Sequence, residues 1–106
     1  MQPGCLRLML AAFSFGVMAI PAHAATIQIV IENLVYAPAT ASAKVGDTIE
    51  WVNKDVLAHT STSRNGDFDV MVPPKQTVTS VLKKAGTVDY YCRFHPNMKA
   101  TLKIEP

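Results

Sequence analysis

Nine residues near the C-terminus, Tyr90-Tyr91-Cys92-Arg93-Phe94-His95-Pro96-Asn97-Met98, place a thiol, an imidazole and a thioether within seven positions. The stretch reads C-x2-H-x2-M. An apolar–polar alternation runs into the cysteine, and another begins at Ala100. Alternation of this kind predicts strands on both sides of the loop. A loop anchored by a strand at each end can hold these three side chains in fixed directions.

The rest of the chain repeats the same period of two. Strict alternation over five or six residues predicts a strand with one buried face. Turn residues separate the runs at spacings near ten, and no stretch after residue 25 shows a helical period. We therefore expect one all-β sandwich or barrel of seven to eight short antiparallel strands. The alternating runs are residues 27–32, 48–53, 68–72, 77–82, 88–93 and 100–105.

An export signal precedes this domain. Leu8 to Ile20 is a run of thirteen apolar or small residues, Arg7 stands before it, and Pro21-Ala22-His23-Ala24 ends in Ala-x-Ala. These are the parts of a secretory signal peptide, and thirteen residues are too few for a membrane-spanning helix, which needs about 20. We expect cleavage after Ala24. Residues 25–106 then form one periplasmic domain of 82 residues without stable membrane insertion.

The composition of residues 25–106 excludes several functions. Nine Lys and Arg face eight Asp and Glu, a balance that argues against nucleic-acid binding. Eighty-two residues are too few for a Rossmann fold, a TIM barrel or most enzymes with a deep cleft. Cys92 is the one cysteine. In an oxidising compartment such a thiol is a liability unless it is buried, paired between chains or bound to a metal.

The donor set indicates copper. Soft sulfur ligands with imidazole favour this metal, and a His2Cys plane with a weak axial Met is the blue-copper arrangement. Cys92, His95 and Met98 supply three ligands, and His59 is the only other histidine of residues 25–106. Zinc is a weaker candidate, because its structural sites do not use thioether. We expect one type 1 Cu(I)/Cu(II) ion and one-electron transfer rather than an enzyme, since no position is open for a substrate.

The sequence resembles a cupredoxin of the plastocyanin and amicyanin type over residues 26–105. The two-residue spacers of the ligand loop match the short form of amicyanins. The resemblance rests on residues 31–33, 36–38 and 44–55, on His59, and on residues 85–98.

The resemblance implies an eight-stranded Greek-key sandwich. It implies that Asn53 hydrogen-bonds across to the segment after the cysteine and joins the two ligand regions. Arg93 stands where amicyanins commonly have Thr, so only backbone atoms remain there for that bond. The implied copper ligands are His59, Cys92, His95 and Met98.

The resemblance also suggests that the ring edge of His95 reaches an apolar patch for docking. Simple turn packing explains Met71 and the prolines equally well. If three cations, Lys75, Arg93 and Lys99, ring this patch, they favour an acidic partner, although simple solvated surface charges are the more common explanation. The protein is expected to be a monomer whose partners are a c-type cytochrome, a periplasmic dehydrogenase or a membrane electron-transfer complex. The expected patch is lined by Leu57, Met71, Pro73, Phe94 and Pro96.

Two other functions remain open. A periplasmic protein that delivers or buffers copper can use the same ligands, although this chain lacks the Met-rich or His-rich tracts common in copper-collecting proteins. A metal-free sandwich that serves as an interaction module is the other. Its folding stability would be indifferent to copper.

Overall fold

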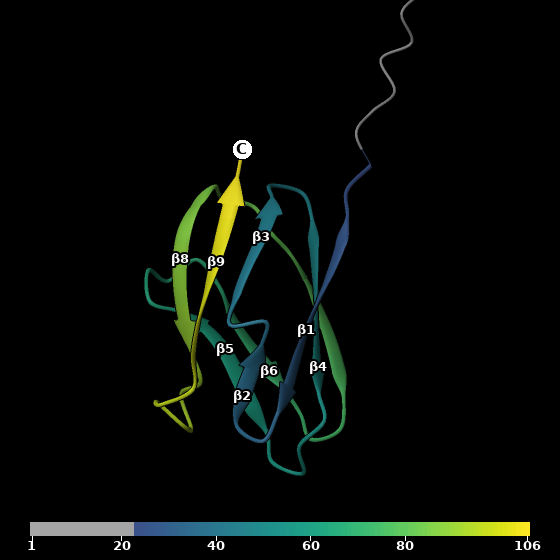
Figure 1. Cartoon of the computed structure of the whole chain (residues 1–106), viewed down its shortest axis with the longest axis vertical. Coiled ribbons are helices and arrows are strands. Elements are labelled where there is room, and N and C mark those ends of the chain that lie inside the picture. Colours follow the sequence, from purple (N-terminus) through teal and green to yellow (C-terminus); the bar gives the residue numbers. More distant parts are fainter. Residues whose placement is uncertain (1–22) are drawn as a thin grey trace, which may run out of the picture.

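The computed structural model describes residues 23–106, so the apolar run of the expected signal peptide lies outside the described residues. The described part forms nine strands in two facing sheets (Figure 1). It contains no helix long and apolar enough to cross a membrane. The strands are β1 (Thr26–Glu32), β2 (Val35–Ala37), β3 (Thr40–Lys44), β4 (Thr48–Asn53), β5 (His59–Ser63), β6 (Asp69–Val72), β7 (Thr77–Val81), β8 (Gly86–Tyr91) and β9 (Lys99–Glu105).

The all-β sandwich is as expected, and every alternating run of the sequence overlaps a strand. The number of strands is higher than the seven to eight expected, because β2, β3 and β5 lack an obvious alternation of large apolar residues. β2 has three residues, and β3 turns only two alanines inward. β5 reads His-Thr-Ser-Thr-Ser and is nonetheless almost wholly buried.

The expectation of antiparallel strands is wrong for two neighbouring pairs. The sheets have the orders β2-β1-β4-β7 and β3-β9-β8-β5-β6. Within them β1 pairs with β4, and β3 with β9, in parallel. Parallel neighbours require a crossover connection, which antiparallel hairpins do not. A period of two shows which face of a strand is buried and contains no information on the direction of its neighbour.

The core between the sheets is built around three fully buried aromatic residues. Tyr90 of β8 meets the ring edges of Trp51 and Tyr36, with ring centroids 5.3 and 4.8 Å apart. Edge-to-face pairs of this kind contribute about 0.5–1.5 kcal/mol each beyond their buried area. They join β4 and β2 of one sheet to β8 of the other and hold the strand that leads into Cys92. The aliphatic part of the core includes Ile29, Ile31, Ile49, Val72, Leu82, Val88, Leu102 and Ile104.

Two buried tyrosines allow a matched test of this core. The Tyr36 hydroxyl donates to the Thr60 carbonyl, whereas the buried Tyr90 hydroxyl has no hydrogen-bond partner among the described residues. We expect Tyr36→Phe to lower the free energy of unfolding by about 1 kcal/mol, because it removes a buried hydrogen bond. Tyr90→Phe removes an unsatisfied polar group and is expected to leave the stability unchanged or raise it. Urea denaturation of both variants measures the difference, and equal losses would contradict it.

Candidate metal centre

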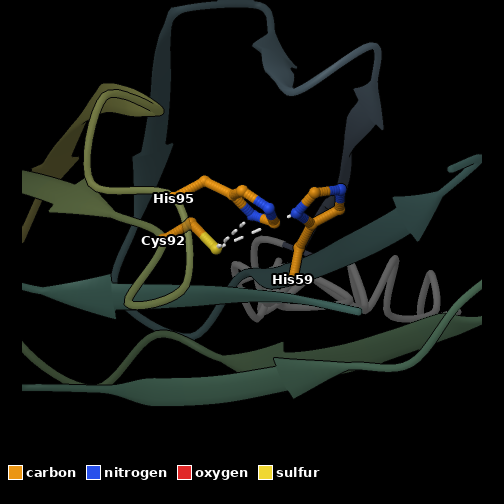
Figure 2. A group of neighbouring side chains, drawn as sticks. All are labelled: His59, Cys92 and His95. Carbon is orange, nitrogen blue, oxygen red and sulfur yellow. Dashed lines mark hydrogen bonds between the residues drawn. The ribbon is translucent and has the colours of Figure 1, made fainter. Parts of the chain in front are cut away.

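Three donor side chains from two separate parts of the chain converge at one end of the sandwich. His59 begins β5, Cys92 directly follows β8, and His95 lies in the loop to β9. Figure 2 shows the two imidazole rings and the thiol pointing toward one another. The Cys92 Sγ atom lies 3.8 Å from His59 Nδ1 and 3.7 Å from His95 Nδ1. All three donor atoms lie within 4.8 Å of one another.

This spacing fits a single metal ion. The room between the three atoms suits bonds of about 2.0–2.3 Å, the usual lengths to imidazole nitrogen and thiolate sulfur. A plane of one thiolate and two imidazoles is the donor set of type 1 copper. His59 and Cys92 are fully buried and His95 is half-buried, so the centre has one edge toward solvent. The residues present therefore fit copper.

The short ligand loop is closed by its own backbone. The Cys92 N–H donates to the Met98 carbonyl (3.2 Å), and the Met98 N–H donates to the His95 carbonyl (2.8 Å). These two bonds hold the backbone of Met98 beside both other predicted ligands of the loop, and the residue is only 3% exposed. Met98 is thus a buried residue of the ligand loop, and its role as a ligand stays a prediction.

A carboxylate that the sequence analysis did not identify orients His59. Its Nε2 atom lies 2.8 Å from Asp55 Oδ2. Because a carboxylate at neutral pH only accepts hydrogen bonds, the ring proton lies on Nε2, and the Nδ1 lone pair faces Cys92. A carboxylate behind a ligating histidine fixes its tautomer and increases its basicity. The signal was available in the sequence as an acidic residue four positions before the histidine, which is too common a spacing to be read alone.

The same carboxylate holds the turn between β1 and β2. It accepts hydrogen bonds from the N–H groups of Asn33 (2.7 Å) and Leu34 (3.0 Å), two residues in the left-handed region with φ of 53° and 63°. Partial burial alone would raise the pKa of Asp55, but these two N–H groups and the His59 ring hold the pKa below its usual value. Asp55 therefore stays ionised and joins the turn at Leu34 to the histidine.

Thr60 connects the two ligand regions. Its N–H donates to the Cys92 sulfur (3.3 Å), and its Oγ1 accepts the N–H of Arg93 (2.8 Å). The Thr60 hydroxyl in turn donates to Thr62, which donates to Asp69 Oδ1 (2.7 Å), and the Arg93 side chain returns to the same carboxylate (3.2 Å). This closed ring fixes the residue after the cysteine from both its backbone and its side chain.

The hydrogen-bond partner predicted for Asn53 is therefore wrong. Asn53 is buried, but its amide donates to the carbonyls of Leu57, Val72 and Pro73, at 2.8 to 3.1 Å. These groups belong to the two segments that flank His59, and the segment after the cysteine is bound by Thr60 instead. With Arg93 in place of a residue with a hydroxyl group, the bridging hydroxyl is supplied from the opposite strand. Asn53 holds the loop before His59 against the end of β6 by hydrogen bonds.

Two of the five expected docking residues, Phe94 and Pro96, lie beside His95. They line a shallow hollow of about 390 Å³ together with His95 and with Leu34 from the β1–β2 turn. Leu57 and Met71 are about half exposed, and Pro73 is half-buried. The Asn53 amide holds the backbones of Leu57 and Pro73 together. Nothing in the sequence indicated that Leu34 lines this hollow, since only the fold brings its turn to the ligand loop.

The role of Asp55 in orienting His59 can be tested by substitution. Asp55→Ala removes the acceptor of His59 and of the β1–β2 turn, so we expect copper affinity to fall by about 10–100-fold. Asp55→Asn retains one acceptor oxygen and should have a smaller effect. Asp89→Ala is the matched control, because that exposed carboxylate of β8 binds Thr101 and not the site. Copper titration against a competing chelator gives the affinities. A loss in Asp55→Ala no greater than in the control would refute the role of this carboxylate.

Comparisons with known proteins lead to the same conclusion as the geometry of the site. A model of the cupredoxin-like domain matches residues 5–104. Amicyanin from Paracoccus versutus is 28% identical over 92 residues, which cover 81% of this chain and 68% of that protein. The methylamine utilization protein MauL from Methylorubrum extorquens is 32% identical over 97 residues, 88% of this chain and 85% of that protein. A reduced Cu(I) structure of an amicyanin variant at pH 4 superimposes with a TM-score of 0.68 at 27% identity, over 86% of this chain and 90% of that one. The chain belongs to the cupredoxin family.

Proposed function

We propose that this protein is an exported type 1 copper protein that carries one electron at a time between redox proteins. The observation that carries the proposal is the convergence of the His59, Cys92 and His95 donor atoms within 4.8 Å. Like amicyanin and plastocyanin, to which it is similar, it is an electron carrier and not an enzyme. When bound, copper supplies the Cu(I)/Cu(II) couple.

The ligand roles follow from the donor atoms. Copper would be held by His59 Nδ1, His95 Nδ1 and Cys92 Sγ, with the Met98 thioether as a weaker fourth donor. The surrounding hydrogen bonds hold these side chains at fixed positions: Asp55 behind His59, and the Thr60 N–H on the sulfur. A site preorganised in this way changes little between the two oxidation states, which keeps the reorganisation cost of electron exchange small. Hydrogen bonding at the cysteine sulfur also tunes the reduction potential.

Electrons enter and leave through the edge of His95. It is the one ligand of the plane that reaches solvent, and apolar side chains surround it. We propose that Leu57, Met71, Pro73, Phe94 and Pro96, together with Leu34, form the docking patch. Arg93 lies over the Phe94 ring, 5.6 Å from its centroid, while its Nε atom pairs with Asp69, so the charge at this side of the patch is largely balanced. The favoured partner is therefore a redox protein with an apolar contact surface.

Burial of the ligands separates an electron carrier from a copper-delivery protein. Handing copper to an acceptor requires incoming ligands to displace resident ones one at a time. Here two ligands of the plane are fully buried and Met98 nearly so. His95 alone is half-buried. This closed arrangement favours retention of the metal and transfer of the electron.

Export completes the proposal. We propose that residues 1–24 direct the chain to the periplasm and are cleaved off after Ala24. The product, residues 25–106, contains all nine strands and every proposed ligand.

The spectrum of the copper-loaded protein tests the ligand set. One equivalent of Cu(II) is expected to give an intense visible thiolate-to-copper band and a narrow EPR hyperfine splitting, both typical of His2Cys(Met) copper. Cys92→Ser removes the thiolate and should lose the band. Met71→Leu is the control, because Met71 is an exposed methionine outside the ligand loop. A pale protein with an ordinary tetragonal signal would contradict the assignment. A melting temperature that copper does not raise would favour a metal-free interaction module.

Electron transfer and copper delivery predict different behaviour in one mixing experiment. Cu(I) protein mixed with the Cu(II) form of a small cupredoxin should exchange electrons rapidly, while each protein keeps its own copper. The readouts are the visible bands and the copper content after the two proteins are separated. Measurable transfer of copper to a copper-free acceptor, with slow electron exchange, would establish delivery instead.

A further inference from the structure

At the end of the sandwich opposite the metal centre, an ordered carboxylate binds the backbone at the start of β1. Figure 1 shows the start of β1 and the C-terminal end of β9 together at this end, away from the β8–β9 ligand loop. Here the N atom of Ala25 donates to Asp47 Oδ1 at 2.9 Å. The Ala25 carbonyl accepts the N–H of Thr48 at 2.9 Å. The backbone of Ala25 is therefore held on both sides, one residue before β1 begins.

The Asp47 carboxylate is ordered and positioned to pair with a cation. Its side chain is buried, with only 7% of the residue exposed, and lies in the turn between β3 and β4 that Gly46 forms with a φ of 95°. Its second oxygen accepts the N–H of Lys44 (2.8 Å). The hydrogen bonds from Ala25 and Lys44 hold the pKa of Asp47 below its usual value. The carboxylate is thus ionised, nearly buried and faces the N atom of Ala25.

We propose that cleavage of the export signal completes this site, by creating an α-ammonium group on Ala25 that forms an ion pair with Asp47. The inference rests on the proposed cleavage after Ala24. A signal peptidase adds water to the Ala24 carbonyl carbon and breaks its bond to the Ala25 nitrogen. The nitrogen leaves as an α-amino group and takes up a proton at neutral pH, because its ordinary pKa is about 7.7–8.0. The atom that gains the charge is the one already bonded to Asp47.

The arrangement avoids the usual weakness of surface ion pairs. Exposed pairs contribute little, partly because two long side chains must be ordered. Here the cation is on a backbone that β1 and Thr48 already order, and its partner is buried. A charge-assisted hydrogen bond is about twice as strong as a neutral one. The surrounding hollow, about 370 Å³, adds the ionisable groups Lys44, Glu105 and His23, and cleavage removes His23.

Two consequences follow from the charge. The folded domain becomes more stable only after export, when the precursor has been processed. The extra stability also has limits in pH. It is lost in acid as the pH falls through the depressed pKa of Asp47, and in alkali as the α-amino group deprotonates.

The test compares the natural terminus with a displaced one. The full chain is exported to a bacterial periplasm, and intact mass identifies its first residue, expected to be Ala25. An extended variant carries Gly-Ser inserted between Ala24 and Ala25, so that the ammonium lies two residues away while the Ala25 N–H remains. The extended protein is expected to melt about 4–8 °C lower at pH 7. The gap should close at pH 10.

A double-mutant cycle assigns the effect to Asp47. In the Asp47→Asn background the extension should change the melting temperature little, because the partner charge is absent. Glu105→Gln is the matched control, since it removes a carboxylate of the same hollow and should leave the full effect. A first residue other than Ala25 overturns the proposal, as does an extension effect equal in both backgrounds. Should Asp47→Asn not fold, the extended variant decides alone, and equal melting temperatures overturn the proposal.

The outcome is independent of the proposed electron-transfer function. Asp47 lies at the other end of the sandwich from His59, so the visible band of the copper-loaded protein is expected to be the same with either terminus. Loss of the ion pair with an intact band refutes this inference alone. An absent band with an intact terminus effect refutes the copper assignment alone.

Discussion

The metal centre depends on one connection, the pair of hydrogen bonds by which Thr60 joins β5 to the end of β8. Its N–H binds the Cys92 sulfur, and its hydroxyl binds the backbone of Arg93. The pairing of β5 with β8 ends at Thr62 and Tyr91, and the two Thr60 bonds continue the connection to Cys92 and Arg93. The relay through Thr62 to Asp69, and the return from the Arg93 side chain, make the connection a closed ring. Such a ring limits the motion of the thiolate relative to the imidazole.

Polar groups in β5 are buried at a cost that the structure largely offsets. A buried hydroxyl without a partner costs about 1–3 kcal/mol. Thr60, Thr62 and Ser63 each find a partner, and Ser63 both donates to the Phe68 carbonyl and accepts its N–H. Only the Ser61 hydroxyl in β5 has no partner among the described residues. The strand is therefore an ordered polar element inside an apolar sandwich, and the Tyr36 hydroxyl donates to its Thr60 carbonyl.

The two ends of the sandwich use the same physical device for different purposes. At one end the Asp55 carboxylate binds two backbone N–H groups and a ligand ring. At the other the Asp47 carboxylate binds the N–H groups of Lys44 and Ala25. Each carboxylate orders a turn and still faces one group whose charge or tautomer matters. The first orients a metal ligand, and the second stabilises the start of the domain.

The sequence by itself was sufficient for the all-β class and for the three donors that the fold brings together, His59, Cys92 and His95. An alternating run reports the burial of its own side chains, and the C-x2-H-x2-M loop places three donors by covalent spacing alone. With His59 as the only other histidine of residues 25–106, the set was complete before any fold was known. These features are local, and local features can be read from a chain.

Only the tertiary structure decided how those residues are connected. The parallel pairing of β1 with β4 depends on which strands become neighbours. The alternation of apolar and polar residues does not determine this. β5 was missed because its buried side chains are polar and show no alternation of apolar with polar residues. Likewise Thr60 acts on a residue 33 positions away, and Leu34 reaches the ligand loop only through the β1–β2 turn. Hydrogen bonds between distant segments have no sequence period. The link between the two ligand regions was therefore assigned to Asn53, whereas the structure makes it through Thr60.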